Sequence, residues 1–452
     1  MLLKRITAIF LTVIFVMSSF CCLTAKAATF NADVDTKCKA IYLLNIDTDT
    51  LVYEKDSSKK VFPASTTKIM TYIVSVEHIK DLKGTKITVE KDVLDRLIGT
   101  GSSLSGLEYF VGQSVTAYDL LNCLMIKSGN DAAMLLAYYI GEGSIQTFVD
   151  MMNDKAETLG CKNTHFMNPH GLHDKDHYTT AEDLAIMTRY AQTLPEFNDI
   201  TNRVSAYISV DKAKEYPLVT TNYMIDEIRG GNYYYEYAKG VKTGTTDEAG
   251  YCLVSTATKG GYTYLCVALG AASVDNNGKE IEDNGAMQDS KALYEWAFEN
   301  LELKNVINEQ TPVCEIPVSL AWNQDTLQLI PEGSFSAILP KDVEASSIDI
   351  SADIPGSVTA PVIEGNKIGT ATVSYANQKL TEVNLIAAET VERSKILYFL
   401  DTAKKIIQSK WMILAVSILV FLLIIYIIIA LMYNISRDKK RKNRKKNKSS
   451  RK

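Results

Sequence analysis

Three short strings with side chains that could carry out chemistry occur in a fixed order along the chain: Ser65-Thr66-Thr67-Lys68, Ser128-Gly129-Asn130 and Lys242-Thr243-Gly244. A serine hydroxyl is a poor nucleophile until a neighbouring base takes its proton as the oxygen attacks a carbonyl carbon. Residues three apart lie on the same side of a helix, so the Lys68 amine is expected beside the Ser65 oxygen. The first string therefore predicts a nucleophile, Ser65, with its own base, Lys68.

The surroundings of Ser65 distinguish it from other serines with the same spacing. Ser-x-x-Lys occurs five times, starting at Ser57, Ser65, Ser209, Ser436 and Ser449. Only Ser65 has a proline two residues before it and an apolar run, 69–74, after its lysine, as in the first turns of a buried helix. The other two strings each occur once, and their order favours a single composite site.

A lysine acts as a base only if it is neutral part of the time, so burial or a second cation must lower its pKa. Lys242 is the predicted second cation. The Ser128-Gly129-Asn130 string interrupts two apolar helical runs, 118–126 and 132–137, so its polar side chains are expected to face a cleft. There Ser128 could relay a proton and Asn130 could hold a substrate amide.

The third string lies in a glycine-rich, strand-like segment, 240–246. A glycine at position 244 would let a substrate backbone approach closely and pair with this segment as an additional strand. Backbone amides of the same segment could then bind an oxyanion.

Further stretches of the chain carry a family likeness: 40–45, 53–55, 62–65, 113–121, 128–133, 166–172, 177–185 and 240–252. By these residues, and over positions from about 35 to 300, the chain resembles the D-alanyl-D-alanine carboxypeptidases of the low-molecular-mass penicillin-binding protein family. The resemblance implies a serine-type acyl-enzyme mechanism that removes the terminal D-alanine from peptidoglycan stem peptides. It also implies inhibition by penicillin and other β-lactams, and no cofactor.

The resemblance assigns the following site residues: Ser65 as nucleophile, Lys68 as base, Ser128 as proton shuttle, Asn130, Lys242 and Thr243 as substrate contacts, and the backbone amides of Ser65 and Thr245 as the oxyanion hole. One departure concerns the terminal carboxylate of the substrate. Many members have an arginine near its binding site, where a rough alignment places Thr263. Lys242 and Thr243 alone, or Arg229 from the preceding loop, are the alternatives for binding it.

Other activities remain open at this point. A weakened carboxylate site would favour cross-links as substrates, which leaves an endopeptidase or transpeptidase as an alternative. A catalytically weak penicillin-binding scaffold for wall synthesis is a second. A class A β-lactamase is not favoured, because such enzymes add a glutamate that activates the deacylating water. None of the acids between residues 160 and 185 stands in a Glu-x-x-Leu-Asn setting, so slow deacylation of penicillin is expected.

Four of the five histidines lie within thirteen residues, at His165, His170, His173 and His177. The last two have a helical ligand spacing that would suit zinc. The segment favours a loop instead, because it contains Pro169 and Gly171 and has an Asp-Lys-Asp run between His173 and His177. We therefore predict no metal site, and loop histidines near the rim of the active site.

The two ends of the chain indicate a membrane-bound, exported enzyme. Residues 1–27 have a basic start, an apolar core and an Ala-Lys-Ala end, as in a secretory signal peptide. Residues 411–433 form an uncharged apolar run long enough to cross a membrane. A basic tail, 434–452, follows it and is predicted to be cytoplasmic by the positive-inside rule, which places the catalytic domain outside.

The charge balance agrees with this topology. The whole chain carries −5, and setting aside a tail of net +10 and three basic residues of the signal peptide leaves about −18 on the exported part. Such an acidic domain argues against nucleic acid as a partner, and lipid headgroups are the expected partner of the tail. The six cysteines after residue 27 are scattered, which predicts no disulfide framework and leaves a single bridge open.

The elements that must position these side chains indicate two exported domains. Strand-like runs at both ends of 30–300, with helical runs between them, predict an α/β fold of the penicillin-binding serine transferase and β-lactamase type: an antiparallel sheet flanked by helices, with a helical insert. Short alternating runs over 305–385 predict a small all-β C-terminal domain. A linker, 386–410, would join it to the transmembrane helix.

Overall fold

The computed structural model describes residues 30, 32–211, 214–275, 277–344, 347–376 and 378–449, and the predicted signal peptide, 1–27, lies outside them. The chain divides into two compact units. The first comprises Met1–Lys304 and Ser336–Val343, and the second comprises Asn305–Phe335 and Glu344–Lys452.

A five-stranded sheet in the order β2-β1-β9-β8-β7 forms the centre of the first unit. Its strands are β1 (Ala40–Asn45), β2 (Thr50–Lys55), β7 (Ala238–Thr246), β8 (Gly250–Lys259) and β9 (Tyr262–Ala271). All neighbouring strands are antiparallel. Because β1 pairs with β9, the two ends of the domain sequence meet in one sheet, and β7 lies at its edge.

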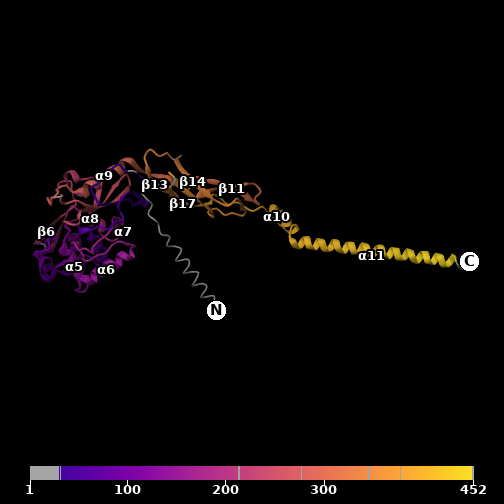
Figure 1. The fold of residues 1–452 in the computed structure, drawn as a ribbon, viewed down its shortest axis with the longest axis horizontal. Coiled ribbons are helices and arrows are strands. Elements are labelled where there is room, and N and C mark those ends of the chain that lie inside the picture. Colours follow the sequence, from indigo (N-terminus) through magenta and orange to yellow (C-terminus); the bar gives the residue numbers. More distant parts are fainter. Residues whose placement is uncertain are drawn as a thin grey trace. The chain divides into compact units, whose positions relative to one another are not determined.

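Side chains alternate between the two faces of this sheet, as the two-residue period of a strand requires. On β9, Leu265 and Val267 belong to one buried core, and Cys266 and Ala268 belong to the other. Helices cover both faces. The first core includes the helical insert, and the second includes α9 (Gly285–Asn300), which Figure 1 shows on the opposite side of the unit from α5 and α6.

The insert between β2 and β7 contains most of the helices of the first unit: α2 (Lys68–His78), α3 (Lys91–Leu94), α4 (Ala117–Met125), α5 (Asn130–Ile140), α6 (Ile145–Thr158), α7 (Ala181–Ala191) and α8 (Phe197–Thr201). Short 3-10 turns are η1 (Ala64–Thr67), η2 (Asp95–Leu97), η3 (Leu107–Phe110), η4 (Tyr223–Ile225) and η5 (Gly231–Tyr233). Two small hairpins complete it, β3 (Lys86–Thr88) with β4 (Ser114–Thr116) and β5 (Ser205–Asp211) with β6 (Lys214–Val219). The predicted sheet flanked by helices, with a helical insert, is confirmed.

The second unit is built on a six-stranded sheet in the order β14-β16-β17-β12-β11-β15. These strands are β11 (Cys314–Ser319), β12 (Thr326–Pro331), β14 (Ile348–Asp353), β15 (Val358–Thr359), β16 (Lys367–Tyr375) and β17 (Gln378–Ala387). Alternate residues such as Leu327 and Leu329 fill its core. The predicted all-β character of this region is confirmed.

One strand of this region belongs to the first unit instead, and the sequence did not indicate this. β13 (Phe335–Pro340) pairs with β10 (Leu301–Ile307), and Ser336–Val343 is part of the first unit. The reason is burial, because Ile338 lies in the core that contains Leu293 and Ala297 of α9. The predicted continuous 305–385 segment is therefore interrupted.

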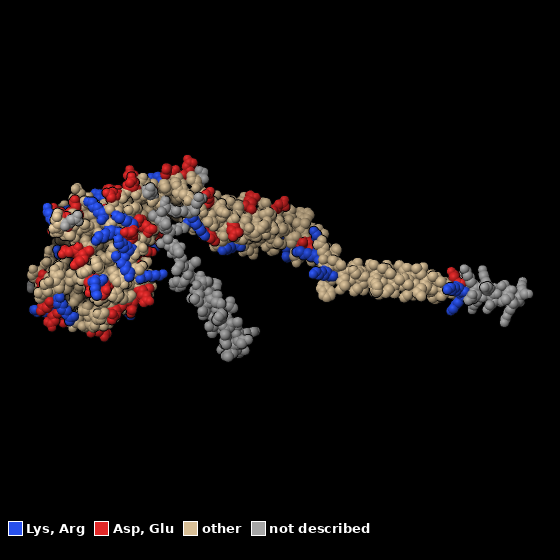
Figure 2. Space-filling view, in the orientation of Figure 1, with Lys and Arg blue, Asp and Glu red and all other residues tan. Residues whose placement is uncertain are grey.

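Two helices follow the β-rich sheet. The predicted linker, 386–410, contains α10 (Lys395–Ile407), whose N-cap hydroxyl on Ser394 accepts a hydrogen bond from the Leu397 amide. α11 (Lys410–Ser449) includes the predicted membrane span, and Lys410–Lys440 has a window of mean hydropathy 3.3. Figure 2 shows an uncharged surface along α11, with charged residues at its far end. This helix is long and apolar enough to cross a membrane.

The six cysteines among the described residues are all free, and all but Cys314 are buried.

Candidate active site

Ser65 and Lys68 lie at a junction between two helical turns. Ser65 is in the 3-10 turn η1, whose N-cap is Pro63, and Lys68 is the first residue of the buried helix α2. In a 3-10 turn, residues i and i+3 eclipse each other. The Lys68 Nζ accordingly lies 2.8 Å from the Ser65 Oγ, so the structure brings the predicted nucleophile and base together.

The Lys68 side chain is fully buried and has two further partners. Its Nζ donates hydrogen bonds of 2.7 Å to the Asn130 Oδ1 and to the His170 backbone carbonyl. Burial is the main cause that lowers the pKa of Lys68 well below its usual value, and the Lys242 cation lowers it further. The Asp131 carboxylate acts in the opposite direction. Lys242 thus acts on the pKa of Lys68 in the expected direction, and its role in the reaction stays a prediction.

Lys242 reaches the second string from the edge strand. Its Nζ donates to the Ser128 Oγ at 2.8 Å and to the Thr243 carbonyl at 2.9 Å. Burial lowers the pKa of Lys242 to about 7. Ser128 lies between α4 and α5 with a φ of +63°, in the left-handed region that non-glycine residues rarely occupy. Strain of this kind is concentrated at functional sites.

The helix that starts at Asn130 also fixes a neighbouring loop. The Asn130 backbone N–H donates to the Ser103 carbonyl at 2.8 Å, and its Nδ2 donates to the Ser102 Oγ at 3.0 Å. The next residue, Asp131, accepts hydrogen bonds of 2.8 Å from both the backbone N–H and the hydroxyl of Ser105. Ser102 and Asp131 were not predicted as site residues, although a carboxylate inside an apolar helical run was a visible signal.

The third string packs directly against the nucleophile turn. A Cβ on Gly244 would lie 3.0 Å from the Ser65 backbone nitrogen and 3.1 Å from the Pro63 carbonyl oxygen. A side chain at position 244 would therefore crowd the chain's own turn, a reason for glycine that differs from the substrate approach expected from the sequence. Because β7 ends the sheet order, its outer edge has no strand partner among the described residues. Thr245 lies on this edge strand, next to Gly244.

Thr243 connects β7 to a loop that the sequence did not single out. Its Oγ1 lies 2.5 Å from the Oγ1 of Thr221. The Thr221 backbone N–H in turn donates to the Ile126 carbonyl at 3.3 Å, at the end of α4. The loop therefore links β7 to the end of α4, two residues before the second string.

The position suggested for Thr263 is wrong. Thr243 pairs with Leu253 on β8, whereas Thr263 pairs with Thr258, five residues further along β8. At about 3.3 Å per residue, these two rows of the sheet are roughly 16 Å apart. Thr263 instead lines a cavity that includes Ile46 and Thr258.

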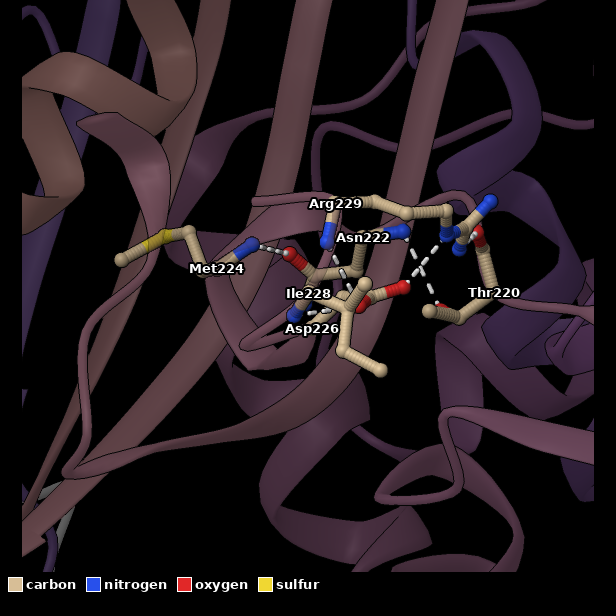
Figure 3. Close-up of polar contacts among 6 residues, drawn as sticks. All are labelled: Thr220, Asn222, Met224, Asp226, Ile228 and Arg229. Atoms are coloured by element: carbon tan, nitrogen blue, oxygen red, sulfur yellow. Dashed lines mark hydrogen bonds and ion pairs between the residues drawn. The ribbon is translucent and has the colours of Figure 1, made fainter. Parts of the chain in front are cut away.

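Arg229 lies closer to the site than Thr263 does. Its Nε donates to the Asp226 carboxylate at 2.6 Å, and its Nη2 donates to the Thr220 carbonyl at 2.8 Å (Figure 3). Thr220 directly precedes Thr221, and Asn222 ties the same loop to β7 through the Gly240 carbonyl at 2.7 Å. The Arg229 side chain is 41% exposed, so it could still bind a ligand.

The histidine-rich segment contributes to the site differently from what was predicted. His170 and His177 are buried rather than at a rim, and burial followed by the Lys68 cation lowers the pKa of His170 to about 3. The His177 ring bonds to Thr67 of the nucleophile turn. Among the described residues there is no group of three or more His, Cys, Asp or Glu that could hold a metal ion.

The chain is similar to proteins of one family over both units. A family model described as D-alanyl-D-alanine carboxypeptidase matches residues 25–273, and one described as Penicillin-binding protein 5, C-terminal domain, matches residues 302–393. The D-alanyl-D-alanine carboxypeptidase DacF of Bacillus subtilis is 29% identical, with 80% of this chain and 88% of the relative covered. A D-alanyl-D-alanine carboxypeptidase of Streptomyces sp. strain K15 is 33% identical, with 52% of this chain and 80% of the relative covered.

Solved structures agree with the fold. Penicillin-binding protein 5 from Haemophilus influenzae matches with a TM-score of 0.62 at 24% identity, over 80% of this chain and all of that one. The Streptomyces K15 DD-transpeptidase matches with a TM-score of 0.53 at 28% identity, over 60% of this chain and all of that one. The predicted penicillin-binding and β-lactamase type of fold is confirmed.

Proposed function

The chain belongs to the D-alanyl-D-alanine carboxypeptidase family, and from that premise we propose that Ser65 removes the terminal D-alanine of peptidoglycan stem peptides through an acyl-enzyme. The observation that carries the assignment to Ser65 is its hydroxyl, 2.8 Å from the buried amine of Lys68. The Ser57 hydroxyl, in another Ser-x-x-Lys string, bonds to Glu54 instead. The enzyme is a serine-type carboxypeptidase of cell-wall peptidoglycan.

The two carbonyl partners of Lys68 explain how it acts as a base. A neutral amine has two N–H groups and one lone pair. The Asn130 Oδ1 and the His170 carbonyl oxygen accept hydrogen bonds and donate none, so they occupy the two N–H groups. The lone pair is then left for the Ser65 hydroxyl, whose proton moves to Lys68 as the oxygen attacks the substrate carbonyl.

The leaving D-alanine takes its proton from the other side of the site. Ser128 accepts a hydrogen bond from the Lys242 Nζ, which leaves its own O–H free to donate. As the C–N bond breaks, Ser128 gives this proton to the leaving amine and recovers one from Lys242. Lys68 has by then gained the proton that Ser65 lost, so the charge within the site is unchanged.

The developing oxyanion is held by the backbone amides of Ser65 and Thr245, on two segments that pack within van der Waals contact at Gly244. The substrate backbone extends along the outer edge of β7, as an added strand. One N–H of Asn130 remains available for a substrate amide after Ser102 takes the other. Lys242 and Thr243 bind the terminal carboxylate, and Arg229 adds positive charge at the same end.

β-Lactams acylate Ser65 in the same way, because their ring amide takes the place of the scissile peptide bond. A class A β-lactamase hydrolyses its penicilloyl-enzyme with a dedicated glutamate, and none of the acids between residues 160 and 185 occurs in that setting. The penicilloyl enzyme therefore persists, and penicillin inhibits the enzyme rather than being destroyed.

The enzyme is anchored by α11, with the catalytic domain outside the cytoplasmic membrane and the basic tail inside. The uncharged run 411–433 within the apolar helix Lys410–Lys440, and the Lys and Arg residues that follow this run, support this orientation. The tail contacts anionic lipid headgroups. Along the sequence, the β-rich domain lies between the catalytic domain and the membrane helix.

The test is product analysis with two substrates. The enzyme is incubated with a stem pentapeptide and with a cross-linked stem-peptide dimer, and the products are identified by mass spectrometry. The proposal expects loss of one D-alanine from the pentapeptide and little cleavage of the dimer. Cleavage of the dimer in preference to the pentapeptide would overturn the carboxypeptidase assignment in favour of an endopeptidase.

A further inference from the structure

Thr67, between the nucleophile and its base, makes two hydrogen bonds that do not involve the substrate. Its side chain is buried, and its Oγ1 donates to the Ala64 carbonyl at 2.8 Å. The same oxygen lies 2.8 Å from the Nε2 of His177, which is 110 residues away in sequence. The mechanism described above uses neither residue.

The direction of the His177 hydrogen bond follows from its other nitrogen. The Met167 backbone N–H donates to the His177 Nδ1 at 3.1 Å, so Nδ1 has a lone pair. In a neutral imidazole the proton is then on Nε2, which donates it to the Thr67 Oγ1. Burial lowers the pKa of His177 to about 4, so the ring is neutral at pH 7. Hydrogen bonds therefore run in one direction from Met167 through His177 and Thr67 to Ala64.

The carbonyl at the end of these hydrogen bonds belongs to an unusual residue. Ala64 has a φ of +47°, in the left-handed region, and such a conformation persists only where its surroundings hold it. Gly171 packs against it so closely that a Cβ there would lie 1.9 Å from the Ala64 carbonyl oxygen. The carbonyl is thus held between Thr67 and a glycine of the histidine-rich segment.

The orientation of this carbonyl determines the orientation of an amide. The Ala64 carbonyl and the Ser65 N–H belong to the same planar trans peptide group and point in opposite directions. Whatever fixes the first also fixes the second. The Ser65 N–H is one of the two proposed oxyanion donors, and such donors act through their preset direction.

We propose that His177 and Thr67 are a positioning pair that aims the Ser65 backbone N–H at the oxyanion. Neither residue touches the substrate, and both act through the Ala64–Ser65 peptide group. The inference rests on the proposed function, since it assumes that Ser65 forms an acyl-enzyme. Its signature is a loss of kcat, with KM unchanged, whenever the hydrogen bond from residue 177 to Thr67 is lost.

Two variants of His177 separate this role from a general structural one. His177→Gln keeps an amide N–H where Nε2 was and loses the acceptor for Met167. His177→Asn keeps the acceptor near the Nδ1 position and is too short to reach Thr67. Both lose the edge-on contact of the ring with Phe166, so both should lower the melting temperature by a similar amount.

The expected result is a difference in catalysis between two variants of equal stability. Removal of one oxyanion donor lowers kcat by about 10²–10³-fold, and a misaligned donor should cost less. We expect kcat for D-alanine release to fall about 10- to 100-fold in His177→Asn and less than about 5-fold in His177→Gln, with KM unchanged. Equal losses of kcat in the two variants, in proportion to stability, would overturn the proposal.

A second pair tests the other residue. Thr67→Ser keeps the hydroxyl that donates to Ala64, and Thr67→Val replaces it with a methyl group of the same shape. We expect penicillin to acylate Thr67→Ser at close to the normal rate and Thr67→Val about 10- to 100-fold more slowly. Penicillin labelling also separates the two proposals. If the enzyme without substitutions is never acylated, the proposed function is contradicted. If Thr67→Val is acylated at the normal rate, only the positioning pair is contradicted.

Discussion

At the residue scale, the proposed reactivity of Ser65 depends on the protonation state of one lysine. Two carbonyl oxygens hold the N–H groups of Lys68, and burial together with Lys242 lowers its pKa. Acylation by penicillin reports on the free enzyme, so its rate should rise as pH rises through the pKa of Lys68. Because that pKa is lowered, the rise should occur well below pH 10.5.

Replacement of Lys242 by methionine should move this rise to higher pH. The Lys242 cation lowers the pKa of Lys68 by repulsion, so its removal makes Lys68 easier to protonate. The acylation rate itself should also fall, because Ser128 loses its donor. The measurement is the pH dependence of the penicillin acylation rate in Lys242→Met, and an unchanged midpoint would count against electrostatic coupling of the two lysines.

Replacement of Asp131 by asparagine should move the same rise in the opposite direction. The Asp131 carboxylate raises the pKa of Lys68, so its loss should shift the midpoint to lower pH. Asparagine keeps only one of the two carboxylate oxygens that accept hydrogen bonds from Ser105, so a lower melting temperature should accompany the shift. The same pH titration checks it, and a shift to higher pH in Asp131→Asn would contradict the assigned sign.

Two kinds of site residue could be predicted from the sequence. The partner of such a residue lies either a few positions away or in another of the three strings. Ser65 and Lys68 are three residues apart, and Ser128 and Lys242 each carry a string of their own. Their assigned roles remain predictions, although the structure brings the four side chains together. Thr221 and His177 could not be found in this way, because their contacts with Thr243 and Thr67 span 22 and 110 residues and depend on how loops pack.

At the element scale, the site depends on the contact between β7 and the turn η1. Gly244→Ala would place a methyl group 3.0 Å from the Ser65 nitrogen, so the strand or the turn must move. Overpacking of this kind costs about 1–3 kcal/mol of unfolding free energy. We expect that loss in denaturant unfolding, together with a fall of at least about 10-fold in the penicillin acylation rate, since the displaced groups include both proposed oxyanion donors.

Gly356→Ala is the matched control for this variant. A Cβ on Gly356 would meet nothing within 4 Å, and the residue lies outside the catalytic unit. Its stability should change by less than about 0.5 kcal/mol, with normal acylation. If Gly244→Ala behaved like this control, the close packing of β7 on η1 would not be what positions the nucleophile.

The strands could largely be predicted from the sequence, but the pairing of residues between neighbouring strands could not. The runs 40–45, 251–256 and 262–270 fall within β1, β8 and β9. Thr263 lies beside the Gly260-Gly261 turn and pairs with Thr258, five residues along β8 from Leu253, the partner of Thr243. A rough alignment could not anticipate it, because residue spacing along one strand does not determine the pairing partner on the next.

At the scale of the whole molecule, burial rather than sequence order determines which segment belongs to which unit. Ser336–Val343 joins the first unit because Ile338 completes a core that is otherwise formed by α9 and the sheet. The short apolar run Ala337-Ile338-Leu339 is compatible with a strand but carries no information about which sheet the strand will enter.

The membrane anchor is tested by truncation. No residue in the most apolar 18-residue window of Lys410–Lys440 is buried within the chain, as expected for a segment that faces lipid. Removal of residues 410–452 should move the enzyme from the membrane fraction to the soluble fraction after cell lysis, with kcat and KM for a stem pentapeptide unchanged. Retention of the truncated enzyme on membranes would show that another segment, such as α10, is sufficient for binding.

The most direct test of the account is penicillin labelling and D-alanine release in Ser65→Ala beside Ser57→Ala, a variant at another serine with the same Ser-x-x-Lys spacing. Ser57 bonds to Glu54 and lies outside the proposed site. We predict that Ser65→Ala is folded, takes up no penicillin and releases no D-alanine, whereas Ser57→Ala does both at close to the normal rate. Labelling or release that persists in a folded Ser65→Ala variant would contradict the assignment of the nucleophile.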